Sequence, residues 1–302
     1  MSDYGHDLLF GTFVTPAGQP PRHGVDMATA SEAAGLDLVS FQDHPYQPSF
    51  LDTSTLITYV ASQTERIAVS ANVASLPLRP PLSLARGAST LDSLSRGRFR
   101  LGIGAGAFWD GIARMGDRRL SAGQGVDALA EGINVIRQAW EVDSLEPITS
   151  QGTYYRADSA ARGPRPFHPI PIWVGAYKPR MLDLTGRLAD GWLPTMEYVE
   201  GGLQGLAANN ARIDDAAENA GRIPTEVRRL MNFMTVGMTA TTQGLLNGPP
   251  EVWVQQIAGM ALEYGLSAFI IGGDDPSIIA RFGAEVAPAV RELVAQERGT
   301  TR

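Results

Sequence analysis

The chain has 302 residues, of which 44% are hydrophobic, with a formal net charge of -7 and no cysteine. This length suits one α/β barrel, and the acidic balance without a Lys/Arg cluster excludes nucleic acid and anionic membranes as expected partners. The absence of cysteine excludes disulfides, zinc–thiolate sites and thiol nucleophiles.

Residues 1–7 are polar and carry no basic residue, so we predict no signal peptide, and no apolar run approaches membrane-spanning length. The four histidines are widely scattered and none has metal-ligand spacing with another. We therefore expect a soluble cytoplasmic protein without a metal site.

Runs of β-prone residues alternate with helical patterns along the whole chain. We predict strands over residues 8–14, 36–41, 67–73, 99–103, 170–174, from 192 onward, 227–236 and 266–271. We predict helices over residues 23–34, 56–64, 80–94, 121–140, 179–188, 203–220, 250–264 and 279–293. The alternation predicts a (β/α)8 TIM barrel formed as a single domain by residues 1–302, with a doubly wound open sheet as the alternative.

Particular residues mark the ends of these helices. Ser121 and Gln124 have the spacing of a capping box. Gly35, Gly97 and Gly265 each end a helix directly before a strand, as short links do in alternating folds. The pattern is lost over residues 142–168, which indicates an excursion from the repeat, and over the Gly/Thr-rich loop 237–249.

The stretch over residues 169–194 predicts a complete strand, turn, helix and strand. Gly175 and Ala176 follow the strand, and Pro179 opens the helix, so free backbone N–H groups at this point form a seat for a phosphate. Lys178 and Arg180 either face that phosphate or are solvated surface charges.

Residues 102–107 match the dinucleotide fingerprint G-x-G-x-x-A. A loop over residues 108–110 and a long helix follow, instead of the required second strand with its acidic residue, so we reject that interpretation. The glycines either turn the chain at the barrel rim or let a flat ring lie against bare backbone, and we favour the ring.

His44 is the histidine that directly follows a predicted strand, where an imidazole suits proton exchange near neutral pH. A solvent-facing turn residue is the equal alternative. The aromatic residues Tyr46, Phe108 and Trp109 lie on predicted rim loops and either wall a substrate pocket or cover the barrel.

Several motifs together resemble the bacterial luciferase-like monooxygenase superfamily. They are residues 171–176, 180–182, 185–187, 189–192, 97–104 and 42–44. The resemblance covers nearly the whole chain and implies a TIM barrel, usually dimeric, that binds a flavin or deazaflavin at the carboxyl ends of its strands. The Asp43-His44 pair resembles the branch that uses the deazaflavin coenzyme F420.

The resemblance also implies roles for individual residues. It places His44 near the reactive ring carbon as the catalytic group and Asp43 against the ring system. It implies a bulge with a non-proline cis peptide behind the deazaflavin, at Asn72, Val73 and Ala74. The remaining implied cofactor contacts are Gly104, Ala105, Gly106 and Ala107 at the ring or ribityl chain, and Gly175, Ala176 and Tyr177 at the phosphate end.

One residue departs from the family pattern. Deazaflavin-dependent sugar-phosphate and alcohol dehydrogenases of this family carry a glutamate where this chain has Ala107, so His44 or the substrate must move the proton. We expect a homodimeric, F420-dependent oxidoreductase that transfers a hydride between cofactor and a small organic substrate. The alternatives are an FMN-dependent monooxygenase, a non-catalytic flavin-binding barrel and, more remotely, a nicotinamide dehydrogenase on an open sheet.

Overall fold

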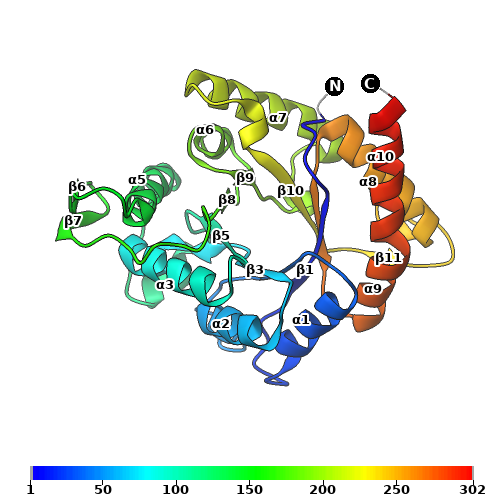
Figure 1. Cartoon of the computed structure of the whole chain (residues 1–302), viewed down its shortest axis with the longest axis horizontal. Coiled ribbons are helices and arrows are strands. Elements are labelled where there is room, and N and C mark those ends of the chain that lie inside the picture. The colour runs from blue at the N-terminus through cyan, green and yellow to red at the C-terminus, as the bar shows by residue number, and fades with distance from the viewer. Residues whose placement is uncertain (1–2, 301–302) are drawn as a thin grey trace.

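The computed structural model describes residues 3–300, whose parallel strands close into a barrel (Figure 1). The strands are β1 Leu9–Val14, β2 Leu38–Phe41, β3 Ala68–Ala71, β4 Ala74–Ser75, β5 Phe99–Gly104, β8 Ile172–Val174, β9 Gly191–Trp192, β10 Arg228–Phe233 and β13 Ala268–Gly272. Neighbours in the barrel follow the chain order, β13 pairs with β1, and β3 and β4 both pair with β5. The predicted (β/α)8 barrel is therefore confirmed, with β3 and β4 acting as one interrupted strand.

Helices surround this barrel on its outside (Figure 1). They are α1 His23–Ala33, α2 Thr53–Gln63, α3 Pro81–Leu94, α5 Ala122–Trp140, α6 Pro179–Leu188, α7 Gly202–Asn219, α8 Pro250–Tyr264, α9 Pro276–Arg281 and α10 Ala287–Thr300. The capping box at Ser121 is confirmed. Gly35, Gly97 and Gly265 have φ values of 76°, 86° and 68°, the left-handed region that glycine adopts readily at helix ends.

Two predicted helices differ from the structure by more than one residue at an end. Helix α2 begins at Thr53, three residues earlier than predicted, because the Asp52 carboxylate accepts a hydrogen bond from the Thr55 N–H and caps it. The last predicted helix consists of α9, a π-helical segment η4 Phe282–Val286 and α10.

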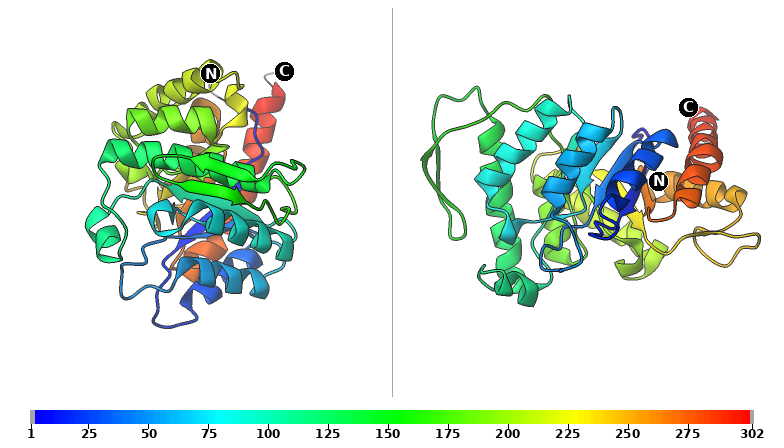
Figure 2. Two further views of the ribbon diagram at one scale, coloured as in Figure 1. Left: turned by 90° about the vertical axis from the view of Figure 1, so that its left-hand side faces the viewer. Right: turned by 90° about the horizontal axis from the view of Figure 1, so that it is seen from below.

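Three predicted irregular segments contain regular structure. The excursion holds an antiparallel hairpin of β6 Ile148–Gln151 and β7 Arg156–Ala160, which lies outside α5 (Figure 2). The predicted loop after β5 contains the short helix α4 Trp109–Arg114. The Gly/Thr-rich loop includes a pairing of β11 Gly237–Met238 with β12 Asn247–Gly248. These short elements escaped prediction because none has a sustained period.

The core has two layers. The larger layer fills the space between strands and helices, with Trp192, Trp253 and Phe269 fully buried. The smaller layer lies inside the barrel and includes Leu38 of β2, Trp173 of β8 and Leu230 of β10. Both layers exclude water, which is the main favourable contribution to folding.

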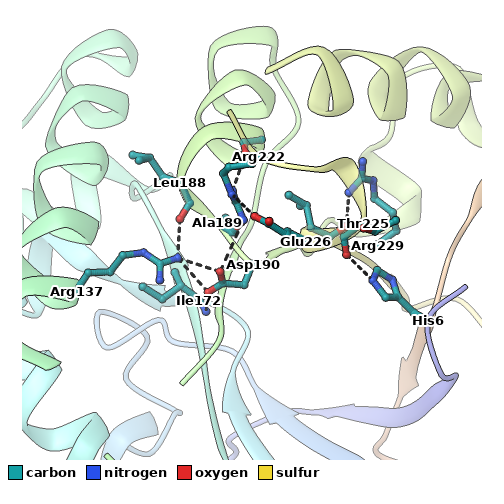
Figure 3. A network of polar contacts seen from close by, with 12 residues as sticks. His6, Arg137, Ile172, Leu188, Ala189, Asp190, Arg222, Thr225, Glu226 and Arg229 are labelled. Carbon is teal, nitrogen blue, oxygen red and sulfur yellow. Dashed lines mark hydrogen bonds and ion pairs between the residues drawn. The ribbon is translucent and has the colours of Figure 1, made fainter. Parts of the chain in front are cut away.

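The amino end of the barrel is held by a polar network (Figure 3). Arg137 of α5 donates to the Leu188 carbonyl at 2.8 Å and to both carboxylate oxygens of Asp190 at 3.0 Å. Asp190 also accepts the Ile172 N–H at 2.8 Å. Arg222 donates to the Ala189 carbonyl at 2.8 Å, so the turn that starts β9 is fixed from both sides.

No helix within residues 3–300 combines the length and hydrophobicity needed to cross a membrane.

Candidate active site

The segment after β2 places Asp43 and His44 at the carboxyl end of the barrel. Asp43 is buried, with 2% exposure. Its carboxylate accepts hydrogen bonds from Arg79 Nε at 2.7 Å, from Arg79 Nη2 at 2.8 Å and from the Ser75 N–H at 3.0 Å. Arg79 also bonds Asp52 at 2.8 Å, so it joins the β2 loop to the start of α2. Asp43 therefore holds the rim together, and its predicted contact with a flavin ring stays a prediction.

His44 forms a close pair with Tyr46. The His44 Nδ1 atom lies 2.6 Å from the Tyr46 hydroxyl oxygen, and the Phe108 ring packs against the imidazole in a T-shaped arrangement at a centroid distance of 5.2 Å. Burial lowers the pKa of His44, against the opposing charge of Asp43. Burial also raises the pKa of Tyr46 to about 12. Near pH 7 both groups are therefore neutral, and the phenol keeps its proton.

Val73 lies at the centre of three strand ends. The peptide bond between Asn72 and Val73 is cis, as the resemblance implies. A Cβ on Gly104 would lie 2.8 Å from Val73 Cγ2, and one on Gly175 would lie 3.3 Å from the same atom. These glycines thus make room for Val73, a packing reason that sequence reasoning did not consider. Ala74 packs in the outer layer, towards the helices, so its side chain does not face the barrel mouth.

A pair of amides crosses the barrel beneath Val73. Asn72 Nδ2 donates to Asn232 Oδ1 at 2.7 Å, and Asn232 Nδ2 donates back to Asn72 Oδ1 at 3.1 Å. Asn232 also reaches the Thr195 hydroxyl at 3.3 Å, and the Thr195 N–H donates to the Tyr177 hydroxyl at 2.9 Å. These hydrogen bonds connect the predicted bulge at Asn72 to Tyr177, at the predicted phosphate end. Asn232 is therefore a candidate site residue that the sequence did not reveal.

The segment after β5 has only small side chains up to Ala107. Ala105 and Gly106 are partly buried and Ala107 is exposed. Gly106 has a φ of 89°, which turns the chain towards α4. The segment therefore offers a smooth backbone surface at the rim, beside Val73.

The predicted phosphate seat needs one correction. The Gly175 N–H donates to the Ile103 carbonyl at 3.2 Å, so this group is already used within the sheet. Ala176 is buried, and Tyr177 is 37% exposed. Lys178 pairs with Glu200 and Arg180 with Asp127, all on the surface, which favours the solvated interpretation of both cations.

A hollow of about 590 Å³ lies beside helix α4, and we call it the α4 hollow. The three predicted aromatic residues line it, together with both ends of α4 and the segment that follows: Tyr46, Phe108, Trp109, Arg114, Met115 and Arg119. The α4 hollow lies beside His44 rather than beside Val73, because Tyr46 and Phe108 line the hollow and also contact His44.

The predicted site residues thus occupy neighbouring strand ends, from β2 through β4 and β5 to β8. The small rim residues over 104–107, the Val73 side chain and the exposed face of Tyr177 fit a flat ring system with a polar tail. Within residues 3–300 no three His, Asp or Glu side chains lie close enough together to hold a metal ion.

Known proteins resemble this chain in sequence. A family model described as luciferase-like monooxygenase matches residues 8–243. An F420-dependent glucose-6-phosphate dehydrogenase of Nakamurella multipartita is 30% identical over 234 residues, which is 75% of this chain and 67% of that protein. One of Microbacterium testaceum is 26% identical over 97% of this chain and 92% of its own length.

Solved structures resemble the fold. An F420-dependent secondary alcohol dehydrogenase in complex with an F420–acetone adduct has a TM-score of 0.81 at 19% identity, covering 94% of this chain and 99% of its own. A long-chain alkane monooxygenase has a TM-score of 0.78 at 15% identity, covering 97% and 92%. At these identities the likeness supports the fold alone.

Proposed function

The chain belongs to the luciferase-like monooxygenase family, and within it we propose that the protein is a coenzyme F420-dependent oxidoreductase acting on a small organic substrate. The observation that carries the proposal is the neutral His44–Tyr46 pair beside a rim of small residues. Sequence relatives named as F420-dependent dehydrogenases support it.

When bound, the deazaflavin supplies a ring carbon that gives or accepts a hydride. The chain supplies the surroundings. Val73 and the backbone over residues 104–107 would support the ring, and Ala176 and Tyr177 would lie at its phosphate end. Asp43 and Arg79 fix the loop that carries His44.

His44 handles the proton in this proposal. The Tyr46 hydroxyl donates to His44 Nδ1, so the single N–H proton of the neutral imidazole lies on Nε2, where it can be donated to a substrate oxygen. During substrate reduction Nε2 gives its proton to the developing alkoxide while Nδ1 takes the Tyr46 hydroxyl proton, and the phenolate then regains a proton from water. Oxidation runs through the same proton transfers in reverse. Because Ala107 replaces the family glutamate, no carboxylate at that position shares this task.

The first test is a fluorescence titration of the purified protein with coenzyme F420 and, in parallel, with FMN. We expect tight binding of the deazaflavin and weak binding of FMN. Replacement His44→Ala should leave F420 affinity within about threefold and remove turnover. Equal loss of affinity and activity would assign His44 to binding alone, and failure of F420 to bind would refute the proposal.

An FMN-dependent monooxygenase is the second candidate. Its support is the description of the matching family model, luciferase-like monooxygenase, which covers residues 8–243. Preferential FMN binding together with substrate-dependent oxygen consumption would establish this candidate and exclude the first.

We further propose that residues 1–302 form one domain, that two copies form a homodimer and that the protein is cytoplasmic. Helix α2 contains no charged residue, and Tyr59 and Leu94 on neighbouring helices are 47% and 75% exposed, which supports an interface there. Light scattering of the purified chain and its Leu94→Glu variant tests the dimer, and cell fractionation tests the location.

A further inference from the structure

The α4 hollow differs from the rest of the rim because it combines exposed apolar side chains with unpaired positive charge. We infer that this hollow binds the substrate, and that the substrate carries an apolar body and one carboxylate. The inference rests on the proposed function and deepens it, because it names a substrate class for the same site.

The apolar component comes from large apolar side chains that are exposed to solvent. Phe108 and Met115 are 59% and 50% exposed, and both line the hollow. Trp109 and Tyr46 complete an aromatic wall. Concave surfaces of this kind, with a few polar groups, are typical of small-molecule sites, and a volume of about 590 Å³ suits a substrate of modest size.

The charged component comes from two arginines. Arg119 pairs with Asp110 across the hollow. Within the described part of the chain, the Arg114 guanidinium has no ion-pair or hydrogen-bond partner. The lining therefore carries one positive charge in excess. A planar guanidinium matches a carboxylate with two parallel hydrogen bonds, so a monoanion complements both the charge and the geometry.

The position of the hollow connects it to the chemistry. Tyr46 lines it and bonds His44, and Phe108 lines it and packs on the His44 ring. A substrate whose carboxylate meets Arg114 thus directs its other end towards His44, where the proposed proton transfer takes place. The rim opposite, around Asp274 and Glu197, is acidic: Asp274 bonds His23, and Glu197 accepts the Met234 and Thr235 N–H groups. That side is unsuited to an anion.

A carboxylate at Arg114 has two sources, because the coenzyme also carries an anionic tail. The test therefore measures probe binding and F420 binding separately. The probes are 3-phenylpropanoate and its neutral amide, which share one apolar body. Their affinities are measured by calorimetry on the full-length protein, with and without F420. The variant is Arg114→Gln, and the control is Arg187→Gln, since Arg187 is exposed in the last turn of α6.

We expect the carboxylate probe to bind about tenfold more tightly than the amide, as one charge-assisted hydrogen-bonded pair predicts. In Arg114→Gln the two probes should bind equally, while Arg187→Gln keeps the difference. Phe108→Ala should weaken both probes alike. The affinity for F420 should be the same in all four proteins.

Three outcomes would overturn the inference. The first is equal affinity of acid and amide for the unaltered protein. The second is an undiminished preference for the acid in Arg114→Gln. The third is a loss of F420 affinity in Arg114→Gln together with exclusion of the acid by bound F420, which would assign the hollow to the coenzyme tail. A protein that binds the acid as expected but not F420 would refute the proposed function and leave the carboxylate site standing.

Discussion

Replacement of Tyr46 by phenylalanine isolates one hydrogen bond at the centre of the site. The ring that packs on His44 and Phe108 remains, and only the hydroxyl 2.6 Å from His44 Nδ1 is lost. A hydroxyl that donates to Nδ1 is compatible only with the neutral imidazole, so its loss removes an interaction that lowers the pKa of His44. A net contribution of about 0.5–1.5 kcal/mol corresponds to a rise of up to roughly one pKa unit.

The assay is ¹H–¹⁵N correlation NMR of the imidazole groups, which is tractable because the chain has four histidines. In the unaltered protein we expect the Nε2-protonated tautomer and a His44 pKa below 6.5, because burial disfavours the charged ring. In Tyr46→Phe the pKa should rise, and the acidic limb of the activity profile should move to higher pH by the same amount. Tyr59→Phe, which alters an exposed phenol, is the control.

Two results would refute this reasoning. A proton on Nδ1 in the unaltered protein would mean that His44 donates to Tyr46 and presents a lone pair, not a proton, to the substrate. An unchanged His44 pKa in Tyr46→Phe would mean that the hydroxyl bond contributes nothing beyond burial.

Two further substitutions test the packing around the site and at the amino end of the barrel. Gly104→Ala places a methyl group 2.8 Å from Val73 Cγ2. We expect calorimetry to show a stability loss of about 1–3 kcal/mol, and we expect at least a tenfold loss of F420 affinity. The control is Gly259→Ala, which has open space around its Cβ position and should keep the F420 affinity and keep or slightly raise the stability. Asp214→Ala leaves the fully buried guanidinium of Arg229 without its carboxylate partner. Urea titrations should show a free energy of unfolding that is lower by about 3 kcal/mol. A decrease of less than about 0.5 kcal/mol would contradict this account.

The sequence was sufficient to predict the barrel because its longer strands and helices each carry a local pattern of apolar and terminal residues. Ser121, Gly35 and Gly265 mark helix ends through short-range hydrogen bonds and backbone conformation, which neighbouring residues determine. His44 could be proposed from the sequence because chemistry in a barrel lies on the loops after the strands, and its catalytic role stays a prediction.

The supporting contacts could not be predicted in the same way. Arg79 meets Asp43 across 36 positions and Asn72 meets Asn232 across 160, so no local spacing relates them. Only closure of the barrel brings these partners together. The packing role of Gly104 is hidden for the same reason, since its neighbour Val73 lies between β3 and β4, outside β5.

The arrangement of Val73 between Gly104 and Gly175 also limits which substitutions can accumulate at this site during evolution. One side chain fills the space that both glycines leave, so a larger residue at either glycine is unfavourable until position 73 becomes smaller. A smaller residue at 73 would in turn leave an unfilled gap. A different side chain at either glycine therefore requires a simultaneous substitution at position 73. The separate α4 hollow can acquire a different substrate preference through single substitutions.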